Sequence, residues 1–294
     1  MSFRLEMLQV ARVAPKALGE SAALVAEFFW SQLSAAGGFI DRNGKPDLYY
    51  TVFGIEGMIA LHLELPRLRI EEWLASFGDG EGLDFVHLCC LARCWCGVDA
   101  ANFSPSARQN LAARIERYRT PDGGYHQSPG KSSGSAYGAL LAGSAYEDLG
   151  LSVPHPEQLA LSMLGLQTAD GAFSNERGQP VGSTTATAAA AAFYRHAGIP
   201  VPDALKRWLL SQCLPGGGFL AFPKAPMPDL LSTAVALHAL GGMQADVSPI
   251  REPCLDFVDS LWSAAGGFHG HWADDMLDCE YTCYGLLALG HLTL

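Results

Sequence analysis

Gly217-Gly218-Phe219 is one of several short glycine–aromatic segments that recur along the chain. The others are Gly37-Gly38-Phe39, Gly123-Gly124-Tyr125, Gly171-Ala172-Phe173 and Gly267-Phe268. Successive aromatic residues lie 86, 48, 46 and 49 residues apart. A degenerate copy at Gly80, Gly82 and Leu83 divides the first interval into 44 and 42 residues. The sequence therefore contains six repeats with a period in the forties.

The residues between these segments are typical of helices. The stretches 184–193, 159–166 and 204–210 are rich in Ala or Leu and lack the period-two alternation of β-strands. A propeller blade has a similar period, but its strands would show that alternation. Each repeat is therefore predicted to contain a helix, a glycine–aromatic loop and a second helix.

The two predicted helices of each repeat differ in charge. First helices carry charges such as Arg108, Arg114 and Glu116, whereas second helices are nearly free of charge after their first turn. A helix that is apolar all round is buried, and a helix with a charged stripe faces water. We therefore expect an inner ring of second helices, which begin near Asp47, Asp84, Ser133, Ser183, Asp229 and Asp278, and an outer ring of first helices.

Both ends of the helical array are apolar, at 22–30 and 284–294, whereas an open solenoid needs polar capping helices. The two ends are therefore expected to cover each other. The predicted fold is an all-α (α/α)6 toroid in a single domain, 1–294. Its six repeats span about 18–64, 65–98, 104–150, 154–198, 202–243 and 249–294.

Composition and charge narrow the classes of function. The chain has 294 residues, of which 49% are hydrophobic, enough for a substantial core. The net charge of −11 and the scattered Lys and Arg residues argue against a nucleic-acid partner. The first 16 residues lack the apolar segment of a signal peptide, and the weakly charged stretch 181–194 is too short to span a membrane. A cytoplasmic protein without a membrane span is expected.

Three second helices begin with an Asp that is followed four residues later by a Thr. These pairs are Asp47 and Thr51, Asp229 and Thr233, and Asp278 and Thr282. Such an Asp can cap the free N–H groups of its helix and offset the helix dipole, which is a structural role. The parallel N-termini would also form a positive mouth suited to an anion such as a diphosphate. Both interpretations stay open from the sequence.

The second helices also carry the side chains expected around a ligand in the ring interior. An amphiphile with an anionic head at the mouth and a hydrocarbon tail in an apolar interior would fit this arrangement. The predicted wall residues could instead be ordinary core residues. They are Tyr49, Tyr50, Phe53, Tyr137, His238, Tyr281 and Tyr284, with Lys131 and Lys224 as the nearby cations.

These repeats resemble the superfamily of prenyltransferase β subunits and squalene-hopene cyclases. The resemblance covers essentially all six repeats and includes Gln167 before Gly171 and Phe173. Within the superfamily, the chain is closer to the protein prenyltransferase β subunits. Their final repeat resembles Asp278, Thr282, Cys283 and Tyr284, and their third resembles Ser135-Ala136-Tyr137. The resemblance implies a toroid that acts on an isoprenoid.

The resembled transferases hold a zinc ion with Asp, Cys and His, and the zinc activates a thiolate that attacks an isoprenoid diphosphate. The family Asp falls on Asp229, but the Cys falls on Leu231 and the His on Tyr281. Because such a site needs about three protein ligands, zinc is not expected at the usual position. The ligands that could substitute are Cys279, Cys283 and His271. The Arg and His of the family's diphosphate clamp fall on Gly134 and Ser183.

The cyclases of this superfamily protonate an alkene with an Asp-x-Asp-Asp motif, which this sequence lacks. Asp274, Asp275 and Asp278 instead form an Asp-Asp-x-x-Asp motif, which binds magnesium and diphosphate in class I terpene synthases. The motif spans a predicted loop and a helix start, so solvated carboxylates and a helix cap are the alternative interpretation. Magnesium stays open as a cofactor, and no other cofactor is indicated.

The function predicted from these observations is a diverged prenyltransferase-like or terpene-cyclase-like enzyme that binds an isoprenoid in its central apolar cavity. Asp229, Asp278 and Tyr281 are its predicted catalytic residues, with Tyr281 as a proton donor or as a π-face for a carbocation. The alternative is a non-catalytic binding or scaffold protein, whose interior could be filled by side chains. A helical partner subunit or a homodimer would need an apolar outer patch, for which Phe28, Phe29 and Trp30 leave room.

Overall fold

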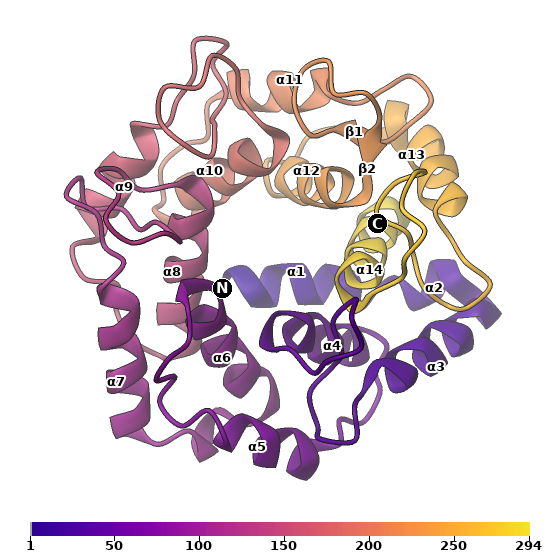
Figure 1. The fold of residues 1–294 in the computed structure, drawn as a ribbon. Helices are drawn as coiled ribbons and strands as arrows, with labels where there is room; N and C mark the ends of the chain where they lie inside the picture. The colour runs from indigo at the N-terminus through magenta and orange to yellow at the C-terminus, as the bar shows by residue number, and fades with distance from the viewer. Residues whose placement is uncertain (1) are drawn as a thin grey trace.

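The computed structural model describes residues 2–294 and is mostly helical (Figure 1). Within these residues, six helices pack side by side into an inner ring. Each contacts the next, and the last contacts the first, which closes the ring. The inner helices are α4 (Leu48–Ala60), α6 (Phe85–Val98), α8 (Ala136–Asp148), α10 (Thr184–His196), α12 (Leu230–Gly242) and α14 (Cys279–Thr293).

The outer helices alternate with the inner helices along the chain and pack against them from outside (Figure 1). They are α3 (Ala22–Gln32), α5 (Arg67–Ala75), α7 (Pro105–Glu116), α9 (Pro156–Leu164), α11 (Asp203–Ser211) and α13 (Ser248–Ser260). Their charged faces are turned to solvent, whereas the inner helices are buried along most of their length. The predicted all-α toroid is confirmed.

The glycine–aromatic segments form the loops that lead into the inner helices. The backbone N–H groups of Phe39 and Phe219 each donate to a Thr Oγ1, of Thr51 and Thr233 respectively, at 2.9 Å. Equivalent bonds join Phe173 to Thr187 and Phe268 to Thr282. Each of these Thr residues is the fourth residue of its inner helix, so the same hydrogen bond locks the loop aromatic in four repeats.

Gly217 shows why these loops require glycine. Its φ is +86°, a backbone conformation that L side chains rarely adopt. A Cβ atom at this position would lie 1.8 Å from the carbonyl oxygen of Pro253 on α13. The loop can therefore approach the next outer helix only without a side chain.

All six inner helices within the described residues begin with a side-chain cap. The capping residues are Asp47, Asp84, Ser135, Ser183, Asp229 and Asp278, and each accepts at least one backbone N–H from the first turn. The third inner helix was expected near Ser133 but begins at Ala136. The reason is that Ser135 Oγ accepts the N–H of Gly138 at 2.9 Å, while Gly134 N–H is held by Asp122 in the loop.

The N-terminal helix α1 (Phe3–Ala11) lies across one end of the ring, which the sequence did not indicate (Figure 1). The Phe3 N–H donates to Glu147 Oε2 at 3.1 Å, near the end of α8. Arg4 pairs with Glu56 at 3.4 Å, and Glu6 pairs with Arg195. These partners lie in the C-terminal halves of inner helices, so α1 closes that end. The opposite end, where the inner helices begin, is the mouth.

The remaining elements are short connections. α2 (Pro15–Leu18) and η1 (Gly19–Ser21) link α1 to α3, and η2 (Ala100–Asn102) precedes α7. β1 (Phe219–Leu220) and β2 (Pro228–Asp229) form a two-residue antiparallel pair that brings Phe219 beside Asp229. In the part of the chain that the structure describes, no helix combines the length and the apolar character needed to cross a membrane.

The apolar patch expected on α3 is smaller than the sequence suggested. Phe28 and Phe29 are buried, and only Trp30 is exposed, at 44%. The reason is that both Phe side chains face the inner ring: the Phe29 ring packs over Gly57 of α4, and Phe28 packs beside the Gly267 loop.

Candidate functional site

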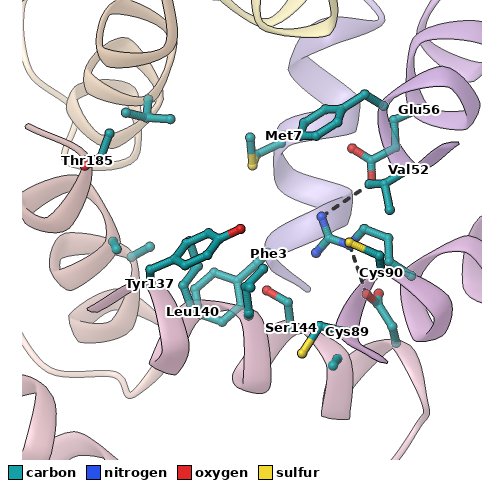
Figure 2. A pocket seen from close by; sticks show the side chains of 18 of the residues that line it. Phe3, Met7, Val52, Glu56, Cys89, Cys90, Tyr137, Leu140, Ser144 and Thr185 are labelled. Carbon is teal, nitrogen blue, oxygen red and sulfur yellow. Dashed lines mark hydrogen bonds and ion pairs between the residues drawn. The ribbon is translucent and has the colours of Figure 1, made fainter. Parts of the chain in front are cut away.

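The ring encloses a central cavity of about 180 Å³. It extends from the first turns of the inner helices down to Phe3 and Met7 of α1, so α1 supplies its floor (Figure 2). Five of the predicted wall residues line it: Tyr49, Phe53, Tyr137, His238 and Tyr284. The interior is therefore open.

The two sides of this cavity differ in chemistry. The side formed by α10 and α12 carries mostly small or apolar residues, namely Thr185, Ala188, Ala189, Ala192 and Val235, together with His238. The side formed by α4, α6 and α8 carries charged and polar side chains, of which Glu56 and Ser144 are labelled in Figure 2. The interior was expected to be apolar throughout, and the structure corrects this: α4, α6 and α8 each place one charged side chain, Glu56, Arg93 or Asp148, in the cavity lining.

Four charged residues form a network on the polar side, which we name the deep cluster: Arg4, Glu56, Arg93 and Asp148. Arg93 Nε donates to Asp148 Oδ2 at 3.0 Å, and Arg93 Nη1 donates to Glu56 Oε1 at 3.4 Å. Arg4 Nε lies 3.4 Å from the same Glu56 oxygen. Burial raises the pKa of Glu56, and its two Arg neighbours oppose the rise. Two cations and two carboxylates balance one another in charge.

A carboxyl group stands at the mouth of the cavity. Glu280, the second residue of α14, accepts a hydrogen bond of 2.6 Å from the hydroxyl of Tyr49, the second residue of α4. Burial raises the pKa of Glu280 to about 7, and the hydrogen bond from Tyr49 offsets only part of the rise. Burial and then the charge of Glu280 raise the pKa of Tyr284, so the carboxyl lies close to the cavity wall. At neutral pH this acid is partly protonated.

A second charged group at the mouth surrounds Arg42. Its Nε donates to Asp278 Oδ2 at 2.6 Å, and its Nη2 donates to Asp274 Oδ2 at 2.8 Å. The guanidinium also lies over the ring of Tyr281, 5.3 Å from its centroid. Asp278 thus caps α14 and pairs with Arg42, while Tyr281 supports the same cation.

This arrangement bears on the predicted magnesium motif. The Arg42 guanidinium already binds the oxygens of Asp274 and Asp278 that a magnesium ion would need. Asp275, the third carboxylate of the motif, is exposed in the loop. Asp274 and Asp278 therefore do not fit a magnesium site.

A family model described as Prenyltransferase alpha-alpha toroid domain matches residues 16–74, 79–198 and 199–293. The chain belongs to the prenyltransferase α/α toroid family. No curated protein matches it.

Solved structures with the same fold include both enzyme classes of this family. A variant of the type II terpene cyclase MstE from Scytonema, in complex with geranylgeranyl dihydroxybenzoate, is 12% identical with a TM-score of 0.62. That alignment covers 95% of this toroid and 97% of the cyclase. Candida albicans protein geranylgeranyltransferase-I, complexed with GGPP, is 12% identical with a TM-score of 0.53, over 98% of this toroid and 82% of that chain. At such identity the likeness shows the fold alone.

The zinc position of the resembled transferases is filled differently in this toroid. Asp229 caps α12, and its carboxylate accepts from the backbone N–H and the hydroxyl of Ser232 at 2.7 and 2.8 Å. Leu231 and Tyr281 offer no zinc ligand of the family's kind. Across residues 2–294, no group of three or more His, Cys, Asp or Glu side chains is arranged to hold a metal ion. The residues at this position therefore do not fit zinc.

The remaining predicted site residues lie outside the cavity lining. Lys131 and Lys224 are exposed in loops. Tyr50 packs edge-on against Tyr49 at the mouth, and burial raises its pKa to about 12. His238, which does line the cavity, shares a 3.0 Å hydrogen bond with His291, and burial lowers its pKa to about 4.

Six charged residues of the deep cluster and the mouth were not predicted: Arg4, Arg42, Glu56, Arg93, Asp148 and Glu280. Glu56 and Arg93 could have been found, because a single charge in the middle of an otherwise apolar helix must have a buried partner. Arg42 and Glu280 carried no such signal, since charges in loops and first helical turns are ordinary.

Proposed function

We propose that this protein converts a neutral isoprenoid in its central cavity, and that Glu280 starts the reaction by protonating an alkene. The observation that carries the proposal is the Glu280 carboxyl, held by Tyr49 at the mouth with a pKa of about 7. A general acid works best when its pKa lies near the operating pH. The reaction class is acid-initiated cyclisation or isomerisation.

The proposed chemistry balances without a co-reactant. The Glu280 proton adds to one carbon of an alkene, which leaves a carbocation on the other and a carboxylate that accepts the Tyr49 hydrogen bond. The π electrons of a second alkene form a new carbon–carbon bond to that cation. A carbon next to the new cation then gives its proton to a water molecule, which returns a proton to the Glu280 carboxylate. The electron pair of the broken C–H bond becomes a double bond, so the product is an isomer of the substrate. The rings of Phe53, Tyr137 and Tyr284 offer π-faces to the cation.

The charges at the mouth favour a neutral substrate over a diphosphate. Carboxylates surround the mouth at Asp47, Asp84, Asp229, Asp278 and Glu280. The cations among them are already paired: Arg42 with Asp274 and Asp278, and His87 with Asp47 and Asp84. A diphosphate would meet this negative field without the clamp that the resembled transferases supply.

Two further features support an enzyme of this class. The cavity is open, whereas a scaffold would be free to fill it. Similar folds in MstE and geranylgeranyltransferase-I bind geranylgeranyl compounds, which suggests the isoprenoid class of substrate. Asp278 and Tyr281, which the sequence suggested as catalytic, are better suited to positioning Arg42 beside the acid.

The test is product analysis with purified protein. Farnesol, geranylgeraniol and their diphosphates are incubated separately, and extracts are examined by gas chromatography and mass spectrometry. We expect a neutral isoprenoid to yield an isomer of unchanged mass. Glu280→Gln should lower the rate by about 10²-fold or more, because the variant keeps the shape of the side chain and loses its acidic proton.

Glu81→Gln is the matched control, since Glu81 is exposed in the loop that precedes α6 and should leave the rate unchanged. Release of inorganic diphosphate would instead support a transferase. Absence of both conversion and binding would leave the non-catalytic toroid as the better interpretation.

A further inference from the structure

We propose that the deep cluster binds a neutral oxygen atom at the far end of the substrate, so that the isoprenoid enters the cavity with its polar end first. This proposal rests on the function proposed above and specifies its substrate class. The deep cluster lies on the side of the cavity formed by α4, α6 and α8. The substrate would be an isoprenoid ketone, ester or alcohol.

Arg93 has hydrogen-bond donors that no protein group in the described part of the chain uses. A guanidinium carries five N–H groups, and the hydrogen bonds to Asp148 and Glu56 involve only Nε and Nη1. Among the described residues, no hydrogen bond uses Nη2 of Arg93. The side chain lines the cavity and keeps 18% of its surface accessible there. A ligand oxygen in the cavity would give these donors the acceptor that they lack.

The charges of the deep cluster favour a neutral ligand. Arg4 and Arg93 balance Glu56 and Asp148, so the deep cluster has no net formal charge. A carboxylate or phosphate brought into it would leave an uncompensated negative charge in a buried environment, which is costly. A carbonyl, ester or hydroxyl oxygen can accept from Arg93 without disturbing that balance. The cluster therefore favours a neutral acceptor over an anion.

The acid and the deep cluster lie at different depths in the ring. Tyr49 and Glu280 are the second residues of their helices, whereas Glu56 and Arg93 are the ninth residues of α4 and α6. At 1.5 Å per residue, the deep cluster lies about 10 Å below the acid along the helix axes. One isoprenoid chain can reach both, with its oxygen at Arg93 and an alkene at Glu280. Protonation would then occur at the end of the substrate remote from its polar group.

The test compares three probes that share a farnesyl-type skeleton: methyl farnesoate, ionised farnesoic acid and β-farnesene. Each is titrated into the full-length protein at pH 8, and binding is followed by tryptophan fluorescence. We expect the ester to bind on the order of tenfold tighter than the hydrocarbon, because it gains a hydrogen bond to a charged donor. The ester should also bind more tightly than the anion. This comparison uses only the wild-type protein, so its result does not depend on whether a variant folds.

Arg93→Lys then tests the residue itself, because it keeps the charge and removes the planar array of donors. We expect it to abolish the preference for the ester while leaving the affinity for β-farnesene unchanged. Arg117→Lys, at an exposed position on the outer ring, is the matched control. Circular dichroism verifies that each variant is folded.

The outcomes separate this proposal from the proposed function. Equal binding of ester and hydrocarbon, or tighter binding of the anion, would overturn the role of the deep cluster while leaving an isoprenoid site in place. An equal loss of affinity for the ester and for β-farnesene in Arg93→Lys would also overturn the role of the deep cluster, since Arg93 would then act only on the shape of the cavity. Failure of all three probes to bind would overturn both proposals.

Discussion

Thr51 shows how much of this fold depends on single hydroxyl groups. It is completely buried, accepts the N–H of Phe39 at 2.9 Å, and donates to the carbonyl oxygen of Asp47 at 2.6 Å. One hydroxyl thereby ties the loop aromatic to the first turn of α4. Thr187, Thr233 and Thr282 accept the same loop hydrogen bond in other repeats.

Replacing Thr51 should test this role. Thr51→Val has nearly the same shape but leaves the Phe39 N–H buried without an acceptor, so we expect a loss of about 1–3 kcal/mol in the free energy of unfolding. Thr51→Ser keeps the hydroxyl and should lose clearly less. Urea denaturation followed by circular dichroism measures both. A stable Thr51→Val variant beside a destabilised Thr51→Ser variant would mean that the methyl group, and not the hydrogen bond, is what matters.

Glu280 predicts a pH dependence of stability. Its pKa is raised by burial from 4.5 to about 7 on folding, so the folded state binds the proton more tightly than the unfolded state. The stabilisation that follows is complete below about pH 4.5 and is lost as the pH rises through 7. Glu280→Gln cannot ionise and should therefore be more stable than the wild type at pH 8, by up to about 3 kcal/mol.

Denaturant titrations at pH 5, 6, 7 and 8 measure this difference. The difference in the free energy of unfolding between Glu280→Gln and the wild type should shrink toward pH 5, where the wild-type carboxyl is protonated. A gap that stays constant with pH would show that Glu280 keeps its ordinary pKa, and the acid assigned to the mouth would then be wrong.

Glycine residues in the inner helix α4 make room for aromatic side chains from a neighbouring loop and from α3. Gly54 of α4 lies directly under the ring of Phe39, and a Cβ atom there would be 2.2 Å from the ring. Gly57, one turn further along, is covered in the same way by Phe29. Glycine normally weakens a helix, and here it makes room for the aromatic residues that fix the ring.

Gly54→Ala should therefore destabilise the protein by about 1–3 kcal/mol, because the Phe39 ring has to move out of a packed core. Gly143→Ala is the matched control on α8, where the nearest side-chain atom would be 3.4 Å away, on Phe193. That change should be neutral or stabilising by up to about 1 kcal/mol, since Ala favours the helix. Thermal unfolding of both variants measures the contrast. A stabilised Gly54→Ala would contradict the proposed packing.

At the scale of the whole molecule, contacts between α14 and α4 close the ring, and α1 packs against both of these helices. Its Arg4 is only 7% exposed and pairs with Glu56 inside the deep cluster. The cavity floor and the charge balance of its wall therefore both depend on the first few residues of the chain.

Arg4→Met should cost about 3–5 kcal/mol at pH 7, because it removes one partner of a buried ion pair and leaves Glu56 with Arg93 alone. The loss should be smaller at pH 5, since the raised pKa of Glu56 lets that carboxyl take up a proton. The double variant Arg4→Met with Glu56→Gln should recover part of the stability at pH 7. Chemical denaturation of the wild type, the single variant and the double variant tests this. An Arg4→Met variant as stable as the wild type would show that the packing of α1 does not depend on the Arg4–Glu56 ion pair.

The sequence by itself determined the toroid, its two rings and five of the residues that line its cavity. These features are periodic or local: the repeat fixes the helices, the charge difference sorts them into rings, and an Asp or Ser at each start caps the helix within one turn. The tertiary structure decided the rest of the site. Tyr49 and Glu280 lie 231 residues apart in the chain, Arg42 and Asp278 lie 236 apart, and α1 reaches across the ring to complete the deep cluster. No local pattern records such pairings, because a charge acquires a partner, a raised pKa and a place on a cavity wall only when the ring closes.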